Sequence, residues 1–192
     1  MSRYLYAFDL SMDCTGLVIF DIDTFKHIHI TSFKTNEKET HGKRLNYIKT
    51  EIQKLFEQYP VYEVAIERGF TRFNVSTQVI YRVHGVINEM FKDCNQKYYP
   101  PKQVKEAILN GNATKKALQN EIKKRYPEVK FSITEVKDKK TKEIRFEENE
   151  DESDAFAVGL THLIKMRNME WEKAIVNKVR KSKKKKSEII EV

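Results

Sequence analysis

The chain has 192 residues, of which 40% are hydrophobic and 11% aromatic, and this composition suits one domain with an apolar core. The formal net charge is +8, and residues 165–192 carry +6 of it. This distribution favours a polyanionic partner, although a basic tail can also serve solubility alone. Cys14 and Cys94 match neither a metal motif nor a disulfide framework. The sequence shows no signal peptide and no long apolar run, so we expect a cytoplasmic protein with no membrane partner.

Three strands and a long helix are predicted for the first part of the chain. Alternating and β-branched residues mark the strands, and an apolar stripe marks the helix, which Pro60 ends. Gly16 falls where the chain must turn back tightly after the first strand. The strands are expected at Tyr4–Asp9, Gly16–Asp21 and Lys26–Phe33, and the helix at about Glu39–Gln58.

Helices and strands alternate in the rest of the chain. Asn110 and Gly111 predict a helix end with a left-handed glycine, and Thr114 predicts the N-cap of the next helix. The predicted elements are a strand at Tyr62–Glu67, a helix at about Val75–Phe91, a strand at Lys97–Tyr99, helices from Lys102 to about Leu109 and at Lys115–Tyr126, a polar hairpin of Phe131–Val136 and Glu143–Glu147, and a helix at Asp151–Met166.

This order predicts the α/β class, with a mixed sheet whose three leading strands are antiparallel and whose faces carry helices. One domain is expected over residues 1–168, with a hairpin insertion at about 128–149 and a basic C-terminal tail at 169–192. The helix at about Val75–Phe91 has more apolar positions than one buried face needs. This excess indicates either deep burial against the sheet or a dimer surface.

Four acidic residues stand at the ends of predicted elements, where packing alone does not require a carboxylate. Asp9 and Glu67 end apolar strands, and Asp151 and Asp154 share one face at the start of an apolar helix. The carboxyl ends of such strands form ligand sites, and neighbouring carboxylates there need a cation to neutralise them. Hard oxygen ligands suit Mg²⁺, with Mn²⁺ as a substitute. In phosphodiester hydrolysis with two ions per active site, one would activate water and the other would stabilise the leaving 3′ oxygen.

Each acid also has a plain structural explanation. Asp151 and Asp154 can simply favour the positive end of a helix dipole. Glu67 can be a salt-bridged strand end, and Asp9 can belong to a turn beside Asp13. The metal hypothesis therefore depends on finding all four acids together in one small domain.

Three ordered motifs resemble those of the RuvC Holliday-junction resolvases, and the lysine-rich chain is most similar to the bacteriophage-encoded members. The similarity covers about residues 4–166, although Leu10 and Ser11 replace the family's Pro-Gly. The motifs are Phe8-Asp9-Leu10-Ser11 with Thr15-Gly16, then Val64-Ala65-Ile66-Glu67-Arg68-Gly69-Phe70, and finally Asp151-Glu152-Ser153-Asp154-Ala155-Phe156-Ala157.

The resemblance implies an RNase H-like fold with a five-stranded sheet, a homodimer, and paired nicks across a four-way DNA junction that use Mg²⁺. Lys105 and Lys115 would hold phosphate or stabilise developing charge, and Lys116 could replace Lys115. The residues that would be both metal ligands and catalytic acids are Asp9, Glu67, Asp151 and Asp154.

The same resemblance implies a DNA-binding surface around the motifs. Phe70 would stack on a base at the opened crossover, although a loop-anchoring phenylalanine is the alternative. The basic residues together predict a phosphate track, while each alone is also typical of a solvated surface charge. The predicted DNA-binding residues are Arg68, Phe70, Arg72, Lys102, Lys105, Lys115 and Lys116.

A junction-resolving endonuclease is the leading hypothesis. The first alternative is a broader structure-selective nuclease that acts on branched DNA such as forks and flaps. The second is a non-catalytic junction-binding protein, which the presence of all four acids disfavours. An actin-like ATPase also has an early Asp and Gly, but such enzymes need two domains around the nucleotide, so the length excludes this class.

Overall fold

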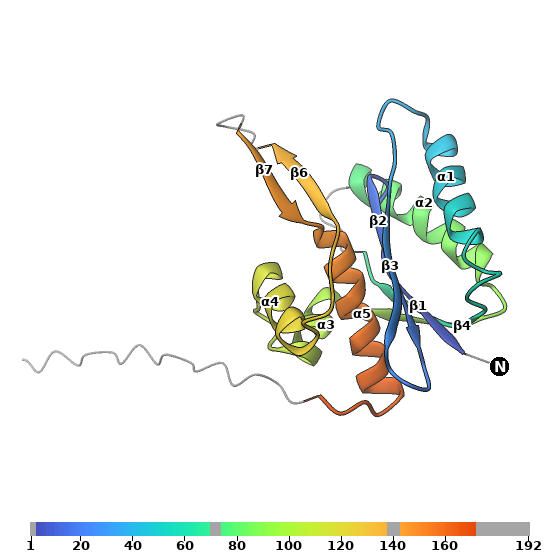
Figure 1. Ribbon diagram of the computed structural model, residues 1–192. Coiled ribbons are helices and arrows are strands. Elements are labelled where there is room, and N and C mark those ends of the chain that lie inside the picture. The colour runs from blue at the N-terminus through green and yellow to red at the C-terminus, as the bar shows by residue number, and fades with distance from the viewer. Residues whose placement is uncertain (1–2, 70–73, 138–142, 172–192) are drawn as a thin grey trace, which may run out of the picture.

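A five-stranded mixed sheet forms the centre of the protein in the computed structural model, which describes residues 3–69, 74–137 and 143–171 (Figure 1). The first three strands are antiparallel neighbours, and the last two run parallel to the first. The strand order is β3-β2-β1-β4-β5. The strands are β1 (Tyr4–Asp9), β2 (Cys14–Asp21), β3 (His27–Lys34), β4 (Val61–Glu67) and β5 (Asn95–Tyr99). The predicted mixed sheet with antiparallel leading strands is confirmed.

Helices cover both faces of this sheet. Two pack on one face, three pack on the other, and a separate two-stranded ribbon leads into the last helix (Figure 1). The helices are α1 (His41–Gln53), α2 (Asn74–Met90), α3 (Pro101–Ile108), α4 (Lys115–Arg125) and α5 (Glu150–Met166), and the ribbon strands are β6 (Ile133–Lys137) and β7 (Ile144–Glu148). Within the described ranges, no helix is both long and apolar enough to cross a bilayer.

Alternation along β1 builds the two layers of the core. Leu5 and Ala7 join the cluster that contains α5, whereas Tyr6 and Phe8 join the cluster that contains α1 and α2. All four side chains are fully buried, as expected for a strand with helices on both faces. The sheet centre is therefore apolar throughout, and polar groups gather at its edges.

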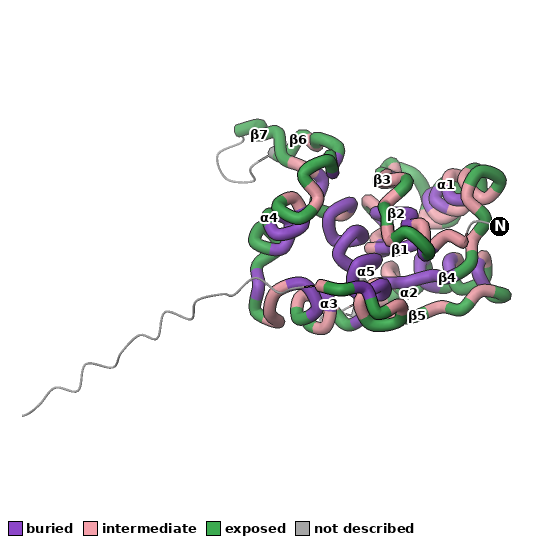
Figure 2. The backbone as a smooth tube through the Cα atoms, turned by 60° about the horizontal axis from the view of Figure 1, so that its bottom comes forward, coloured by how far each residue is buried: buried purple, intermediate pink, exposed green. Residues whose placement is uncertain are grey.

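The last helix is the most deeply buried one, as the continuous buried colouring of α5 in Figure 2 shows. Every residue from Glu152 to Leu163 is buried. Gly159 allows the close approach to the sheet, because a Cβ there would lie 2.2 Å from Phe20 Cε2. The middle of α5 is thus held directly against β1 and β2.

Two details of the sequence-based prediction are wrong. The first long helix ends at Gln53, and tighter turns follow it, because Leu55 and Phe56 donate their backbone N–H groups to carbonyls only three residues earlier. No described glycine has a positive φ, so Gly111 does not end α3 as a left-handed residue. Asn110 orders that turn instead, since its side chain accepts a hydrogen bond from the Asn112 N–H at 3.1 Å.

The packed chain continues past residue 168. Met169 is buried, and the indole of Trp171 stacks on Tyr126 at a centroid distance of 6.3 Å. Trp171 also donates its Nε1–H to the Ile108 carbonyl at 2.9 Å. Residues 169–171 therefore anchor the start of the predicted tail to α3 and α4. The rest of that tail lies outside the described residues.

A buried polar group joins β4 and β5 to the C-terminal part of α5. His162 Nε2 lies 2.9 Å from Glu63 Oε2, and its Nδ1 lies 3.0 Å from the Tyr99 hydroxyl. Arg167 forms an ion pair with Glu63. Burial alone would raise the pKa of Glu63, but the bonds from His162 and Arg167 bring it below the ordinary value.

Glu63→Gln should lower the free energy of unfolding at pH 7 by about 1–3 kcal/mol, because buried partners of the carboxylate lose a charged acceptor. The pKa of Glu63 is lower in the folded state, so its contribution is present above the unfolded-state pKa and is lost as the pH falls through the folded-state pKa. Urea unfolding at pH 7 and pH 3 would measure this. The exposed Glu57→Gln is the control, and an equal effect of both substitutions would contradict the account.

Candidate active site

Three elements bring the four predicted acids to one edge of the sheet. Asp9 ends β1 and Glu67 ends the neighbouring parallel strand β4, so both carboxyl groups emerge at the same edge. The helix α5 begins at this edge, and its first turns carry Asp151 and Asp154. The contact between β2 and the start of α5 at Gly16, which pairs with Asp9, closes the arrangement.

The four acids interact electrostatically. Burial, followed by the charges of Glu67, Asp154 and Asp151, raises the pKa of Asp9 well above its ordinary value. Burial and the charge of Asp154 raise the pKa of Glu67 to about 7. The pKa values of Asp151 and Asp154 are also raised, in both cases mainly by burial. These carboxyl groups therefore share one site, in which the charges of Glu67, Asp154 and Asp151 make the ionisation of Asp9 more difficult.

Lys115 supplies the cationic group closest to these acids. Its Nζ lies 2.5 Å from Asp154 Oδ2 and 3.7 Å from Glu150 Oε2. Burial lowers the pKa of Lys115, but the neighbouring acids outweigh it and raise the pKa overall. The charges of Lys115 and Lys105 also lower the pKa of Glu67. Both lysines predicted for the site are thus beside the carboxylates.

The donor set suits a hard divalent cation. It consists of buried carboxyl groups whose pKa values are raised by burial and by neighbouring negative charge. A bound Mg²⁺-type ion would stabilise their charged form. Among the described residues, however, no three His, Cys, Asp or Glu side chains are already arranged to hold one ion. The Lys115 ammonium group holds one of the acids, Asp154, in an ion pair. Binding of a cation there would require these side chains to rearrange.

Two residues fix the first turn of α5 that carries Asp151. Gly16 lies within β2, as the predicted strand Gly16–Asp21 has it, but the strand begins two residues earlier, so a tight turn does not explain the glycine. A Cβ on it would meet the Asp151 carbonyl oxygen at 2.1 Å. On the other side, Asn149 caps the helix, and its Oδ1 accepts the Glu152 N–H at 3.1 Å. Only glycine at position 16 allows the backbone of this turn to lie against the sheet.

Glu152 is a positioning residue that the sequence reasoning missed. Its side chain is buried and accepts hydrogen bonds from Ser32 Oγ at 2.9 Å, Ser132 Oγ at 2.6 Å and the Ser132 N–H at 2.7 Å. These bonds join β3, the base of the ribbon and the first turn of α5. The spacing of Asn149 and Glu152, typical of a capping box, was the available sequence signal.

The predicted DNA-binding residues surround this edge where the structure describes them. Arg68 is exposed, and its N–H donates to the Tyr99 carbonyl at 2.8 Å. Lys102 is exposed on α3, and Lys116 Nζ donates to Gln119 Oε1 at 3.2 Å. Phe70 and Arg72 lie outside the described residues.

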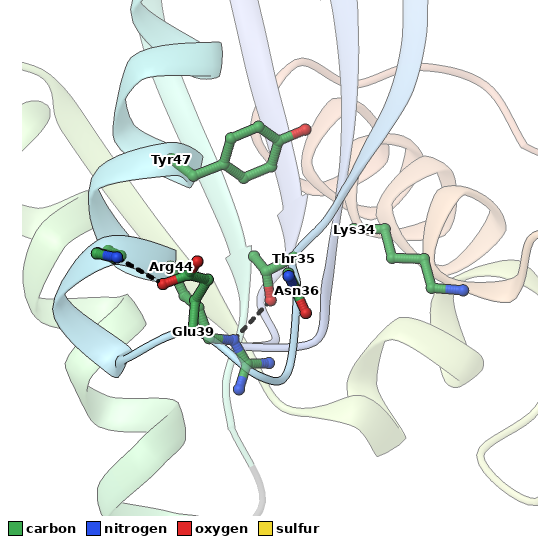
Figure 3. A pocket seen from close by; sticks show the side chains of 7 residues that line it. Lys34, Thr35, Asn36, Glu39, Arg44 and Tyr47 are labelled. Carbon is green, nitrogen blue, oxygen red and sulfur yellow. Dashed lines mark hydrogen bonds and ion pairs between the residues drawn. The ribbon is translucent and has the colours of Figure 1, made fainter.

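A basic pocket of about 360 Å³ lies at the same edge, between the end of β3 and the start of α1 (Figure 3). Arg44 in this pocket donates from Nε to Thr35 Oγ1 at 2.7 Å and forms an ion pair with Asp13. Figure 3 shows Lys34 pointing away from Arg44 and Tyr47. Lys34 also lines a hollow that contains Asp151, which makes it a further basic residue next to the acids.

The fold and the acid-rich edge together define the class. A mixed sheet with three antiparallel leading strands, helices on both faces and carboxylates at the ends of β1 and β4 is an RNase H-like nuclease fold. Thermus thermophilus RuvC has this fold: its structure in complex with Holliday junction substrate matches with a TM-score of 0.66 and 18% identity over 86% of this chain and 96% of that chain. A second Thermus thermophilus RuvC structure matches with a TM-score of 0.65 and 20% identity over the same shares.

The sequence comparisons give the family. The family model described as crossover junction endodeoxyribonuclease RuvC matches residues 11–162. The crossover junction endodeoxyribonuclease RuvC of Alkaliphilus metalliredigens (strain QYMF) is 31% identical over 112 residues, which are 56% of this chain and 68% of the relative. The chain belongs to the RuvC family of crossover junction endodeoxyribonucleases, and it is a hydrolase of the divalent-metal-dependent type found in that family.

Gly16→Ala should displace the first turn of α5 and lower the free energy of unfolding by about 1–3 kcal/mol, because the new methyl group overlaps the Asp151 backbone. We also expect weaker binding of Mg²⁺, measured by calorimetry on the folded variant. Gly42→Ala is the matched control, since a Cβ there meets no atom within 4 Å and a helix gains about 0.5–1 kcal/mol from the change. Unchanged stability and unchanged metal binding of Gly16→Ala would refute this role.

The metal-free protein should lose stability as the pH rises from about 4.5 to about 7. The pKa of Glu67 is about 7 in the folded protein, above its ordinary value, so the folded state holds a proton that the unfolded state has released. The effect is up to about 3 kcal/mol. Urea unfolding in EDTA at pH 5 and 7.5 would measure it. In Glu67→Gln the loss should be smaller, and equal losses in both proteins would argue against the raised pKa.

Proposed function

We propose that this chain is a Mg²⁺-dependent endonuclease that resolves four-way DNA junctions by paired nicks and so serves DNA recombination and repair. The observation that carries this proposal is the cluster of buried, mutually repelling carboxylates at the sheet edge, beside Lys115, in a chain of the RuvC family. The junction bound to the Thermus thermophilus relative supports the choice of substrate.

The four acids would hold the metal, and both Asp9 and Glu67 lie on strands whose position is fixed by the core. When bound, Mg²⁺, or Mn²⁺ in its place, would supply an activated water and neutralise the charge that develops on the leaving 3′ oxygen, with two ions per active site. Lys115 is held by Asp154 when no cation is present. Neutralisation of Asp154 would free the ammonium group of Lys115 to contact the phosphate. Lys105, whose charge acts on Glu67, would contact the phosphate as well.

The DNA would lie across the edge that carries these acids. Lys102, Lys105, Lys115 and Lys116 come from α3 and α4, and Arg68 follows β4, so cations flank the acids on that side. Arg72 and Phe70 would complete this surface, with Phe70 stacking on a base at the crossover. Such a surface contacts backbone phosphates without regard to base sequence.

A homodimer would present one active site to each of two opposed strands of the junction. We propose that α2 forms its interface. Val83 and Ile87 of α2 pack into the core, while Tyr81 is 52% exposed and so remains available for a partner. The nuclease domain would span residues 1–168, with the hairpin insertion at about 128–149. The basic tail 169–192 would follow, and its first residues pack on the domain through Met169 and Trp171. The protein would act in the cytoplasm of a bacterial host.

Asp9→Asn should abolish cutting of four-way junctions and keep their binding, because the loss of a buried ligand removes chemistry and lowers the negative charge that faces DNA. Purified protein with four-way, forked and linear DNA, with and without Mg²⁺, would measure both properties. Asp93→Asn, at an exposed position, is the control.

Symmetric nicks confined to the junction are the expected result for the wild-type protein. Comparable cutting of forked DNA would favour the broader structure-selective nuclease, and binding without any cutting would favour the junction-binding protein. Full nicking by Asp9→Asn would refute the assignment of the metal ligands.

A further inference from the structure

The ribbon of β6 and β7 exposes three large apolar side chains on one face, which also carries Glu135 and Glu148. Ile133, Ile144 and Phe146 are 62%, 54% and 73% exposed. In the strand register Phe146 is opposite Glu135, and Ile133 is opposite Glu148, so alternation places these three apolar side chains on one face. An exposed apolar face on an open ribbon promotes aggregation and is typical of a binding surface.

This face forms one wall of a hollow of about 310 Å³ between the ribbon and α4. Ile133 and Phe146 line it from the ribbon, and Lys116 and Gln119 line it from α4. The hollow therefore combines an aromatic ring, a primary amine and an amide, and the carboxylates of Glu147, Glu148 and Glu150 also line it. The ring is suited to stack on a base, and the amine on the α4 side is suited to contact a phosphate.

Gln119 carries a buried hydrogen-bond donor that lacks an acceptor among the described residues. Its side chain is buried, with 4% of the residue exposed, and its Oε1 accepts a hydrogen bond from Lys116 Nζ at 3.2 Å. Its Nε2 is buried without a hydrogen-bond acceptor among the described residues. A buried donor without an acceptor is unfavourable, and an acceptor atom on a bound ligand would remove that cost.

The hollow lies next to the active site. Glu150, which also lines it, lies 3.7 Å from Lys115 Nζ, and the same amine binds Asp154. The ribbon is fixed at its base, since Asn149 N–H donates to the Ser132 carbonyl at 2.7 Å. Its strand β7 is tied to α4 by the ion pair of Lys123 and Glu148 at 2.6 Å. A strand held at the acids thus has its next nucleotides near this hollow.

We propose that this hollow binds one unpaired nucleotide of the branched DNA, next to the strand held at the active site. Phe146 stacks on the base, Gln119 Nε2 donates to an acceptor on its edge, and Lys116 contacts the adjoining phosphate. Glu147 and Glu148 line the hollow from the ribbon and disfavour a phosphate there, so the ribbon side selects the face of a base and the phosphate lies on the α4 side. The proposal rests on the proposed function and adds to it a second base-stacking position.

The test is the affinity of the full chain for a four-way junction and for a linear duplex, without divalent metal so that no cutting occurs. Phe146→Ala should weaken junction binding by about fivefold or more and leave duplex binding unchanged, because stacking requires an unpaired base. Phe146→Trp should retain the wild-type affinity. Val136→Ala is the matched control, since Val136 is an exposed apolar residue on the opposite face of the same ribbon.

Junctions with a single abasic nucleotide at successive positions around the crossover identify the bound base. When the missing base is the one that Phe146 contacts, the wild-type protein should bind the abasic junction as weakly as Phe146→Ala binds the intact junction. On that abasic junction the wild-type protein and Phe146→Ala should have equal affinity. Gln119→Leu should weaken binding of the intact junction but not of that abasic junction.

Several results would overturn the proposal. One is that Phe146→Ala binds junctions as tightly as Val136→Ala does. Another is that Phe146→Ala loses as much affinity for linear duplex as for junctions. A lower molar mass of Phe146→Ala in light scattering would show instead that the ribbon contacts a second copy of the chain. A wild-type protein without preference for junctions would refute the proposed function itself, and this proposal with it, which is a different outcome from a failure of Phe146→Ala alone.

Discussion

The mutual repulsion of carboxylates at one edge of a buried sheet is the constraint on which this structure depends. Asp9 and Glu67 cannot move apart, because each ends a strand whose other residues are locked into the core. Their burial, together with the neighbouring acids, raises the pKa of both. Such an arrangement is unfavourable for stability alone, so a cation or a proton must be present.

The rest of the fold holds this arrangement in place. The backbone of α5 lies against Gly16, and Glu152 joins the first turn of α5 to β3 and the ribbon through buried hydrogen bonds. Lys115, at the start of α4, offsets part of the negative charge. The ordered, closely packed surroundings therefore keep the acids near one another even though they repel, and a site of this kind is ready for a divalent ion and a phosphodiester.

Much of this could be predicted from the sequence, because local patterns were strong. Apolar strands that end in Asp9 and Glu67, and the Asp151/Asp154 pair at a helix start, indicated both the sheet edge and the residues that meet there. The mixed sheet with three antiparallel leading strands followed from the order of the elements. Single strands and helices with clear periodicity were placed within a few residues.

What the sequence could not show depended on contacts between distant segments. Gly16 was explained by a tight turn before its strand, since nothing in the local sequence shows that the backbone of Asp151 packs on it. The bonds of Glu152 to Ser32 and Ser132 join residues far apart in the chain. The end of α1 at Gln53 was missed because apolar spacing continues beyond it. The hollow beside Phe146 likewise needs the register of the ribbon and the position of α4.

The carboxyl resonance of Glu67, followed by NMR through a pH titration, tests the central claim most directly. Without divalent metal the account predicts a pKa of about 7, and with saturating Mg²⁺ a value far lower, because the ion favours the charged carboxylate. An ordinary pKa near 4.5 in the metal-free protein, unchanged by Mg²⁺, would contradict it.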